Sequence, residues 1–497
     1  MSVPPLSVSS SLPSALAADV LVVGVRQGTD GAVVTSGDEA VSRLLSALDL
    51  RALGVTGAKD ELVRLPAGDL AATVLATIGL GSVVDADALR WASGSATRQL
   101  TGVDRVALDL PVDDEAGALA ALEGAGLGAY AFDAFRGSSA GEQRRHASEV
   151  VLATGLDLPE AVVRRATTVA EAVHTVRDLS NTPPQQLAPA DLADAAVRLA
   201  ADVDVQVEVL AEDELRAGGF GGILGVGQGS SRGPRLVKMT WSPEGATQHL
   251  ALVGKGITYD TGGLSLKPSA SMLGMKDDMT GAATVLAATV AVARLALPVK
   301  VTAWLCVAEN MPSGTAIRPD DVLTIRGGTT VEVTNTDAEG RLVMADGLVA
   351  ASEEQPDLLV DVATLTGAQV VALGMRTFGV MGNDAFADRV VGAADAAGET
   401  AWRMPLPEEL RPRLASDVAD LVNATPGNTA AGMLLAGVFL REFVGTREGT
   451  EEQIPWAHLD IAGPSNNKAG GWGPTPKGST GVAVRTLLGL AADVAAG

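Results

Sequence analysis

The amino-acid sequence predicts an α/β protein of two domains, a smaller N-terminal α/β domain and a larger C-terminal α/β domain with a central mixed sheet flanked by helices. Its 497 residues exceed the length of one ordinary domain. Short runs of β-branched residues alternate with Ala-rich amphipathic segments, which is the pattern of βαβ units. Hydrophobic residues make up 47% of the chain and charged residues 20%, which provides enough apolar material for a core in each domain.

The predicted N-terminal domain comprises residues 1–165. Val20–Val25 is expected to form a buried strand and Glu39–Leu50 a helix. Arg105–Leu110 is expected to form another strand, followed after a turn by a helix over Glu115–Gly124. No cluster of metal-ligating or nucleophilic side chains stands out in this part of the sequence. We therefore assign it no chemistry.

A linker helix and turn are expected over residues 166–187. The helical pattern begins at Leu158 and continues to Leu179, so the domain boundary falls on this helix. It is followed by Asn181–Pro184, whose two prolines stop a helix sharply.

The C-terminal domain, residues 188–497, shows the same alternation with longer elements. A helix is predicted over Thr280–Arg294 and another over Arg341–Glu353. The predicted strands are Val205–Leu210, Arg235–Thr240, His249–Val253, Val299–Cys306 and Leu358–Val362.

Two glycine clusters superficially resemble nucleotide-binding loops. The cluster Gly225–Gly229 is followed by a proline and a strand, whereas a dinucleotide-binding loop leads into a helix. A tight turn is the expected structure there. The cluster Gly254–Gly256 follows a strand but lacks both the earlier glycine and the Ser/Thr after the lysine that a phosphate loop needs.

Composition favours a soluble protein of the cytoplasm. The formal net charge of −23 repels phosphate backbones and anionic lipids, so neither nucleic-acid nor membrane binding is expected. The N-terminus lacks the basic and apolar segments of a secretory signal, and no apolar stretch reaches the ~18 residues of a membrane-spanning helix. The single cysteine, Cys306, rules out an intrachain disulfide and is expected to be a small buried hydrophobe.

The residues that suggest chemistry lie in three segments of the C-terminal domain. The strand His249–Val253 leads into a segment expected to be a loop, and the third segment, Thr334–Leu342, would project alternate side chains together if it were extended. The charged residues are Lys255, Asp260 and Lys267 in the first segment, Asp278 before a helix in the second, and Asp337, Glu339 and Arg341 in the third.

Four carboxylates in an apolar neighbourhood need cations, because they would otherwise repel one another or take up protons. Two divalent metals that share bridging carboxylates would satisfy this need, and ligation rich in oxygen favours Mn²⁺, Mg²⁺ or Zn²⁺. Each aspartate alone is more simply explained as a turn residue or, for Asp278, as a helix N-cap. Their combination with Lys255 favours a metal site.

These segments closely resemble the leucyl aminopeptidase family of cytosolic metallopeptidases. The most specific motif is Asn335–Leu342 (NTDAEGRL), and residues 254–268 and 275–284 match as well. The resemblance covers essentially residues 170–490, whereas the N-terminal third matches only in length and general pattern. Further matching blocks are Arg177–Pro184, Ala308–Pro319, Val362–Gly367 and Trp456–Gly463.

The resemblance implies a role for each charged residue. Asp260 and Glu339 would bridge two metal ions, Mn²⁺ or Zn²⁺ first and Mg²⁺ or Co²⁺ as alternatives. Lys255, as a neutral amine, and Asp278 would complete one metal site, and Asp337 the other. Lys267 would polarise the scissile carbonyl, and Arg341 would hold a bicarbonate ion that acts as general base.

The resemblance also implies substrates and an assembly. The expected activity releases Leu and other apolar residues from the N-termini of peptides, and the expected assembly is a homohexamer of two trimers. A pocket for the first side chain would be lined by Met275, Thr364, Gly367 and Ala462. Ser465 stands where mammalian members carry methionine, which leaves the preference for leucine open.

Two other functions remain as alternatives. A nucleic-acid-binding or architectural role accompanies peptidase activity in some bacterial members of the family, but the charge of −23 argues against it. The same two metals could also serve phosphoester hydrolysis. The histidines are predicted to be structural, because none forms a ligand-spaced pair; they are His146, His174, His249 and His458.

Overall fold

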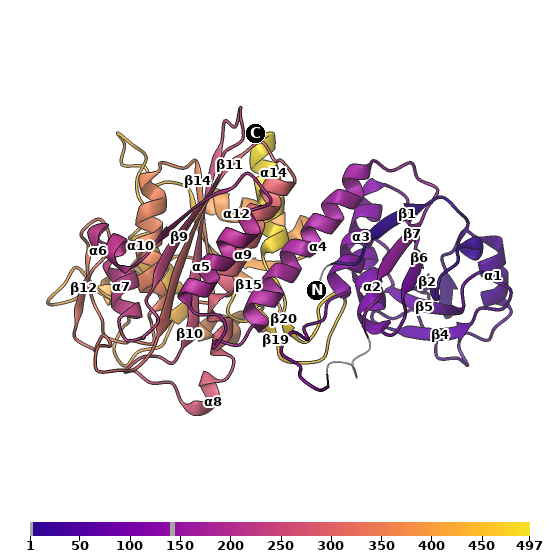
Figure 1. Cartoon of the computed structure of the whole chain (residues 1–497), viewed down its shortest axis with the longest axis horizontal. Helices are drawn as coiled ribbons and strands as arrows, with labels where there is room; N and C mark the ends of the chain where they lie inside the picture. Colours follow the sequence, from indigo (N-terminus) through magenta and orange to yellow (C-terminus); the bar gives the residue numbers. More distant parts are fainter. Residues whose placement is uncertain (1–2, 140–144) are drawn as a thin grey trace. The chain divides into compact units, whose positions relative to one another are not determined.

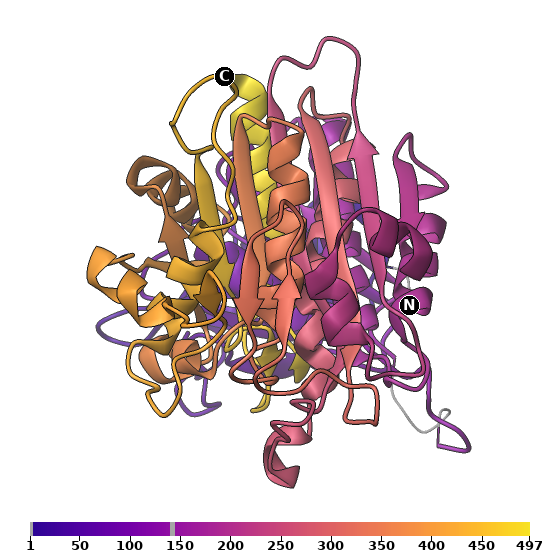
Figure 2. The ribbon, with the colours of Figure 1, turned by 90° about the vertical axis from the view of Figure 1, so that its left-hand side faces the viewer.

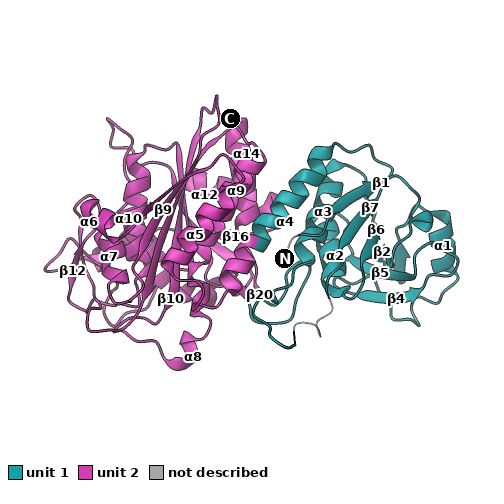
Figure 3. Ribbon diagram, viewed as in Figure 1, with its two compact units in different colours: residues 1–174, 467–478 teal, residues 175–466, 479–497 magenta. Residues whose placement is uncertain are grey.

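The computed structural model describes residues 3–139 and 145–497, which fold into two compact units (Figure 1, Figure 3). Unit 1 comprises Met1–His174 and Asn467–Gly478, and unit 2 comprises Thr175–Asn466 and Ser479–Gly497. The chain leaves unit 1 within helix α4 (Glu160–Asn181) and returns to it for residues 467–478. The linear pattern of the sequence gives no sign of this return.

Unit 1 is a mixed sheet with helices on both faces. Its strands are hydrogen-bonded in the order β1-β7-β6-β2-β5-β4, and β3 pairs with the end of β2. The strands are β1 (Leu6–Ser9), β2 (Val20–Gln27), β3 (Ala32–Val34), β4 (Leu62–Pro66), β5 (Val74–Gly81), β6 (Arg105–Asp109) and β7 (Glu149–Ala153). The helices are α1 (Glu39–Ser46), α2 (Ala86–Gln99), α3 (Glu115–Gly128) and the first part of α4, with the 3₁₀ turn η1 (Pro13–Ala15).

Strand β2 shows why both faces of this sheet are covered. Its side chains alternate between the faces, as in any strand. Val20 and Val22 lie in the core cluster formed with α2 and α3, whereas Leu21 and Val23 lie in the cluster formed with α1. The continuous apolar run in the sequence therefore corresponds to a strand buried on both sides.

Unit 2 is built on a larger mixed sheet, whose long strands lie side by side in Figure 2. The strand order is β16-β15-β18-β14-β10-β11-β9-β8, and the central neighbours β18, β14, β10 and β11 are parallel. These strands are β8 (Gln206–Leu210), β9 (Arg235–Trp241), β10 (His249–Asp260), β11 (Lys300–Asn310), β14 (Leu358–Ala363), β15 (Thr377–Gly382), β16 (Thr400–Arg403) and β18 (Trp456–Asp460).

Helices cover both faces of this sheet. One face carries α5 (Pro189–Ala200), α9 (Thr280–Arg294), α12 (Asp384–Ala396) and α14 (Val484–Ala496), and the other carries α7 (Gly221–Gly227), α10 (Gly340–Glu353) and α13 (Gly432–Arg441). Shorter elements complete the unit: α6 (Glu212–Ala217), α8 (Ser269–Met272), α11 (Gly367–Leu373), β12 (Val322–Thr324), β13 (Thr330–Glu332), β17 (Leu421–Val422), η3 (Met275–Met279) and η4 (Glu408–Leu414). The chain passes from unit 2 to unit 1 within β19 (Asn466–Asn467) and back within β20 (Gly478–Ser479). Within the described residues, no helix has both the length and the apolar character needed to cross a membrane.

Two predicted local structures are wrong. The strand predicted to end at Val253 continues as β10 to Asp260, because the glycine-rich part pairs with β11; a Cβ at Gly254 would lie 2.6 Å from the Cα of Ala282 in α9. The glycine cluster predicted as a tight turn is partly helical, since α7 runs to Gly227. Close packing applies to this cluster too, because a Cβ at Gly229 would lie 2.2 Å from the carbonyl oxygen of Met311.

Candidate metal centre

Strand β10 carries the first two charged residues at its carboxyl end, in the centre of the unit 2 sheet. Lys255 and Asp260 are buried, with 3% and 2% of their surfaces exposed. Both were predicted to lie on a loop after the strand, but they lie on the strand itself. Lys255 is in register with Cys306, and Asp260 with Asn310, on the neighbouring strand β11. Pairing with β11 continues past Lys255 to Asp260, with an irregularity in register between Ile257 and Asp260, whereas pairing with β14 ends at Gly254. The neighbouring strand β11 therefore supports the backbone beneath these side chains.

Asp278 lies on the short 3₁₀ helix η3, directly before α9. Its side chain does not cap the helix, as one interpretation of the sequence suggested, because Met279 occupies the capping position. Asp278 instead accepts hydrogen bonds from Lys255 Nζ at 2.9 Å and from the Thr364 hydroxyl at 2.8 Å. The carboxylate is therefore directed toward β10 and the end of β14.

The third segment is a turn followed by a helix, so the extended conformation considered from the sequence is wrong. The side chain of Asn335 accepts the backbone N–H of Asp337 at 2.8 Å, which is a local bond typical of asparagine turns. Glu339 directly precedes α10, and Arg341 lies in the first turn of that helix. The turn, and not strand alternation, brings Asp337 and Glu339 to the same site.

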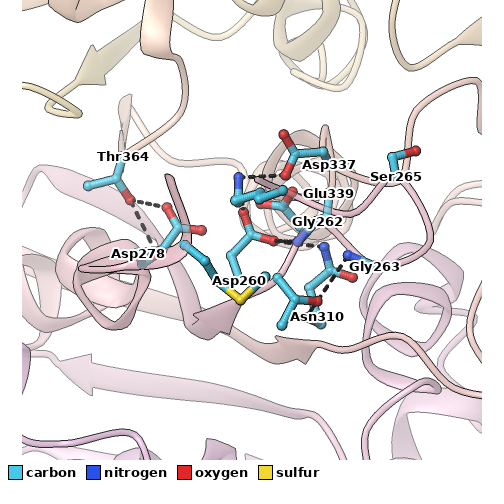
Figure 4. Close-up of polar contacts among 12 residues, drawn as sticks. Asp260, Gly262, Gly263, Ser265, Asp278, Asn310, Asp337, Glu339 and Thr364 are labelled. Atoms are coloured by element: carbon cyan, nitrogen blue, oxygen red, sulfur yellow. Dashed lines mark hydrogen bonds and ion pairs between the residues drawn. The ribbon is translucent and has the colours of Figure 1, made fainter. Parts of the chain in front are cut away.

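The carboxylates from the three segments converge (Figure 4). Oxygens of Asp260, Asp337 and Glu339 lie within 4.8 Å of one another. Lys255 Nζ lies 2.8 Å from Asp278 and 3.0 Å from Glu339. The ammonium group of the second lysine, Lys267, lies 2.8 Å from Asp260 and 2.5 Å from Asp337. Four carboxylates against two ammonium groups leave a formal charge of −2 when all are ionised.

This surplus of negative charge shifts the pKa values of the cluster. Burial and the charge of Asp260 raise the pKa of Glu339 to about 8, and burial raises that of Asp278 to about 6 despite Lys255. Burial alone would lower the pKa of Lys255, but the carboxylates of Asp278, Glu339 and Asp260 outweigh it and raise that pKa. The site thus favours added positive charge.

The donor set fits divalent cations. Carboxylate oxygens are the ligands that hard divalent metals prefer. Glu339 is buried, and its Oε2 atom has no hydrogen-bond partner among the described residues. One oxygen of Asp260 accepts hydrogen bonds from Gly262 N–H and Asn310 Nδ2, both at 2.8 Å, so its other oxygen faces the cluster. The Lys255 amine would ligate a metal only after losing its proton.

Arg341 is a buried cation with an unusual set of neighbours. Its Nη1 donates to the backbone carbonyl of Asn423 at 2.6 Å, and its guanidinium lies 5.8 Å from the ring centroid of Phe439. It forms no ion pair with any carboxylate in the described part of the chain. Burial lowers the pKa of Arg341 to about 10, although Glu339 and Asp460 partly oppose that shift. Such a guanidinium fits an anion.

The four residues predicted to line a substrate pocket lie on three segments. Thr364 is joined to the cluster, because its hydroxyl binds Asp278 and its carbonyl accepts a hydrogen bond from Lys255 at 3.0 Å. Gly367 begins α11 and faces open space, since a Cβ there would meet nothing within 4 Å. Met275 begins η3 and Ala462 follows β18; both are half-buried.

Asp460, which was not predicted, connects two of these segments. Its Oδ1 atom accepts the backbone N–H groups of Leu365 and Ala462, each at 3.2 Å, and its Oδ2 accepts the Thr366 hydroxyl at 2.7 Å. Ser465 is buried, and its hydroxyl donates to the carbonyl of Ala462 at 3.2 Å. Two sequence signals could have found Asp460: it ends the apolar run that forms β18, and it lies in the matching block Trp456–Gly463.

The remaining predictions from single residues can be placed as well. Cys306 is a free, buried thiol, as predicted. His458 binds Asp361 at 2.5 Å, His249 binds the Thr302 hydroxyl at 2.9 Å, and His146 binds the Thr97 carbonyl at 3.0 Å. His174 packs edge-on against Tyr130. None of these histidines lies among the carboxylates described above.

Comparisons with known proteins agree over both units. Residues 174–488 match the model of the cytosol aminopeptidase family catalytic domain, and residues 20–139 match the model of its N-terminal domain. A probable cytosol aminopeptidase of Clavibacter michiganensis subsp. michiganensis is 60% identical over 99% of each chain. A probable cytosol aminopeptidase of Leifsonia xyli subsp. xyli is 57% identical, also over 99% of each chain.

Solved structures give the same assignment. The bottromycin maturation enzyme BotP in complex with Mn superposes with a TM-score of 0.84 at 38% identity, covering 96% of this chain and 100% of that one. A mutant of tomato leucine aminopeptidase superposes with a TM-score of 0.84 at 29% identity, covering 99% of this chain and 96% of that one. The chain is therefore an aminopeptidase that belongs to the cytosol aminopeptidase family.

Proposed function

We propose that the enzyme removes the N-terminal residue from peptides with two divalent metal ions bound in the carboxylate cluster. One observation carries this proposal: four carboxylates from three separate segments converge with a formal charge of −2. Mn²⁺ or Zn²⁺ is the expected metal, with Mg²⁺ and Co²⁺ as alternatives, because the ligands are oxygens and one amine. The solved complex of BotP with Mn supports manganese first.

The residues would divide between two metal sites that share ligands. Asp260, through its oxygen that faces the cluster, and Glu339, whose Oε2 has no hydrogen-bond partner among the described residues, would be shared by the two ions. Lys255 and Asp278, which contact each other, would complete one site. Asp337, which contacts Lys267, would complete the other. Metal ions bound there would lower the pKa of a shared water and supply the nucleophile at neutral pH.

Lys267 is proposed to bind the oxygen of the scissile carbonyl. Burial lowers its pKa, but Asp260 and Glu339 together raise that pKa above its ordinary value, so the ammonium stays protonated. A fixed, charged donor beside the reacting carbon stabilises the oxyanion that forms in the transition state. Its 2.8 Å contact with Asp260 holds it beside the proposed bridging ligand.

Arg341 is proposed to hold a bicarbonate ion. The support is its burial and its set of partners: among the described residues, its guanidinium has no carboxylate partner and donates a hydrogen bond to the Asn423 carbonyl. Bicarbonate held there would accept a proton from the attacking water. Replacement of bicarbonate buffer by a non-coordinating buffer free of carbonate should then lower kcat, and Arg341→Ala should remove that dependence.

The pocket is proposed to accept leucine and other apolar side chains. Two observations support a pocket beside the cluster: the Thr364 hydroxyl binds Asp278, and Asp460 joins the segment of Thr364 and Gly367 to that of Ala462. Met275 begins the same short helix that carries Asp278. The tomato relative named leucine aminopeptidase supports this preference. Ser465 is buried against Ala462, and its small side chain leaves room for residues other than leucine.

Assembly and location are proposed from the family. We propose a cytoplasmic homohexamer that acts on peptides and has no nucleic-acid or membrane partner. The net charge of −23 supports the exclusion of nucleic acid, because phosphate backbones would be repelled. Light scattering after gel filtration should give six times the 50.3 kDa mass of the chain, and a monomer would overturn the hexamer.

The central test uses enzyme stripped of metal by a chelator and then dialysed. It should not release leucine from leucine amide until Mn²⁺ or Zn²⁺ is restored, and it should never act on N-acetyl-leucine amide, whose α-amino group is blocked. Full activity without metal would overturn the proposed mechanism, and equal hydrolysis of the acetylated substrate would overturn its specificity for free N-termini. A phosphodiester assayed in parallel should remain intact, which separates this activity from phosphoester hydrolysis.

A further inference from the structure

Asn423 lies directly after strand β17, beside the loop that carries two of the proposed metal ligands. Strand β17 pairs with β13, and the pairing extends one residue further through the bond from Asn423 N–H to the Glu332 carbonyl at 3.0 Å. The residue is fully buried, with 0% of its surface exposed. The loop opposite it, residues 333–339, connects β13 to α10.

The side-chain amide of Asn423 is completely engaged with the backbone of this loop. Its Oδ1 accepts the N–H of Thr334 at 2.8 Å, the hydroxyl of Thr334 at 3.1 Å and the N–H of Asn335 at 3.2 Å. Its Nδ2 donates to the carbonyls of Asn335 at 2.7 Å and Ala338 at 3.3 Å. Both protons and the oxygen of the amide are therefore used.

The backbone of the same residue contacts a second part of the site. The carbonyl oxygen of Asn423 accepts the hydrogen bond from Arg341 Nη1 at 2.6 Å. The loop held by the side chain ends in Asp337 and Glu339, and Arg341 follows in the first turn of α10. One residue, distant in sequence, thus contacts both the ligand loop and the guanidinium.

We propose that Asn423 is a positioning residue, which fixes the loop bearing Asp337 and Glu339 and the guanidinium of Arg341 relative to each other. The inference rests on the proposed function for what these two parts do. Asn423 touches neither metal nor substrate in this scheme. It acts through the geometry that its bonds impose on the loop and on Arg341.

The physical reason lies in the irregular backbone of the loop. After β13 ends at Glu332, the backbone groups of residues 334–338 have the Asn423 amide as a partner in place of a strand. Removal of this amide leaves two N–H groups and two carbonyls without that partner in a buried place, and each buried polar group left unsatisfied destabilises this arrangement of the loop. The loop would relax to recover those bonds, and the ligands would move with it.

The first experiment measures metal binding and activity of Asn423→Ala. Titration of stripped protein with Mn²⁺ by calorimetry should show a weaker-bound metal whose Kd has risen about 10–100-fold, as for other losses of residues that orient ligands. At saturating Mn²⁺, kcat for leucine amide should fall at least about tenfold, while KM changes less than about threefold. Both Kd values and kcat within twofold of wild type would overturn the inference.

A second variant keeps the test decisive if Asn423→Ala does not fold. Thr334 is half-buried, and Thr334→Val removes only its hydroxyl, whose single proton is shared between Asn423 Oδ1 at 3.1 Å and the Ala424 carbonyl at 2.6 Å. It should raise the weaker Kd for Mn²⁺ about 2–5-fold, because one of several bonds is lost. An unchanged Kd in folded Thr334→Val would overturn the positioning role.

Gln355→Ala is the control; Gln355 is exposed where Asn423 is buried, but its amide makes the same kinds of bond. Gln355 also holds loop backbone through its amide, donating to the carbonyls of Ser352 and Thr446 and accepting the Glu448 N–H, but it follows the far end of α10. Its replacement should leave both Kd values and kcat unchanged. If Gln355→Ala lost as much Mn²⁺ affinity and kcat as Asn423→Ala, the effect would come from general destabilisation of the loops, and the inference would be overturned. Failure of the wild-type enzyme to hydrolyse leucine amide would contradict the proposed function alone. The Mn²⁺ titration would still test the positioning role, because it does not depend on activity.

Discussion

Lys267 contacts carboxylates on two different segments, Asp260 on β10 and Asp337 on the loop before α10. Its replacement therefore has opposite consequences for catalysis and for metal binding. In Lys267→Met, the oxyanion loses its charged donor, and kcat for leucine amide should fall by about 10²–10³ or more. The cluster becomes more negative by one charge, so Mn²⁺ should bind more tightly. Steady-state kinetics and calorimetric titration measure the two effects.

Lys238 offers a matched control for this experiment. It is a partly buried lysine on β9 that forms an ion pair with Glu354 and lies 5.1 Å from the ring centroid of Trp304. Lys238→Met should leave kcat and Mn²⁺ affinity unchanged. Weaker Mn²⁺ binding in Lys267→Met would contradict the charge count for the cluster, and unchanged kcat would remove Lys267 from the mechanism.

His249, at the start of β10, should make the stability of unit 2 depend on pH. Burial, assisted by Lys300, lowers the pKa of His249 from 6.5 to about 4. The neutral ring therefore stabilises the fold above pH 6.5, and that contribution is lost as the pH falls toward 4. Between pH 7 and pH 5, wild type should lose about 1 kcal/mol more unfolding free energy than His249→Gln. Urea denaturation at both pH values measures this; equal losses would contradict it.

Residue type and spacing indicated the charged side chains but not the amides around them. Asp260, Asp278, Asp337 and Glu339 stand out in the sequence because buried carboxylates need cations. Asn310 and Asn423 do not stand out, because an asparagine shows its role only through the backbone groups it meets after folding. These partners lie 50 residues away for Asn310 and Asp260, and 88 residues away for Asn423 and Asn335.

Helix α9 packs closely against the unit 2 sheet at Gly281, so a substitution there tests this packing. A Cβ at Gly281 would lie 2.1 Å from the Val362 carbonyl of β14 and 3.0 Å from the backbone nitrogen of Lys255. Gly281→Ala should push the first turn of α9 from the sheet and displace Asp278, which precedes it. We expect a loss of about 2–4 kcal/mol in unfolding free energy together with weaker Mn²⁺ binding.

Gly392 in α12 provides the opposite case. A Cβ there would meet nothing within 4 Å, so Gly392→Ala should stabilise the protein by about 0.4–1 kcal/mol through helix propensity. Chemical denaturation and Mn²⁺ titration of both variants measure the contrast. Equal stability of the two variants would show that α9 has room to shift, and would contradict close packing as the reason for Gly281.

Sequence patterns predicted elements whose signals are local and missed those whose partners are distant. Helix α9 occupies Thr280–Arg294 as predicted, because an Ala-rich segment with no interior proline favours a helix. The end of β10 was predicted as a loop, since Gly-Lys-Gly has low strand propensity. Its strand structure depends on pairing with β11 and on the approach of α9, neither of which appears in the local sequence.

At the scale of the molecule, the α/β fold class followed from alternation, but the return of residues 467–478 to unit 1 did not. This segment is held in unit 1 by a stack of Trp472 on Trp91, with ring centroids 5.3 Å apart. Arg98 donates to the Gly473 carbonyl, and Asp60 accepts the Gly473 N–H. These partners are 375 and 413 residues apart in sequence, so no local sequence pattern predicts these contacts.

Metal binding should stabilise the two units unequally, because every proposed ligand belongs to unit 2. A ligand that binds only the folded state adds about 2.7 kcal/mol when its concentration is one hundred times its Kd. Hydrogen exchange of stripped protein, with and without Mn²⁺ at that excess, should therefore show slower exchange in β10 and in residues 334–342. The strands of unit 1, such as β2, should exchange at the same rate in both samples. Equal protection of β2 and β10 would mean that the two units open as one, and would contradict a metal effect confined to the unit that supplies the ligands.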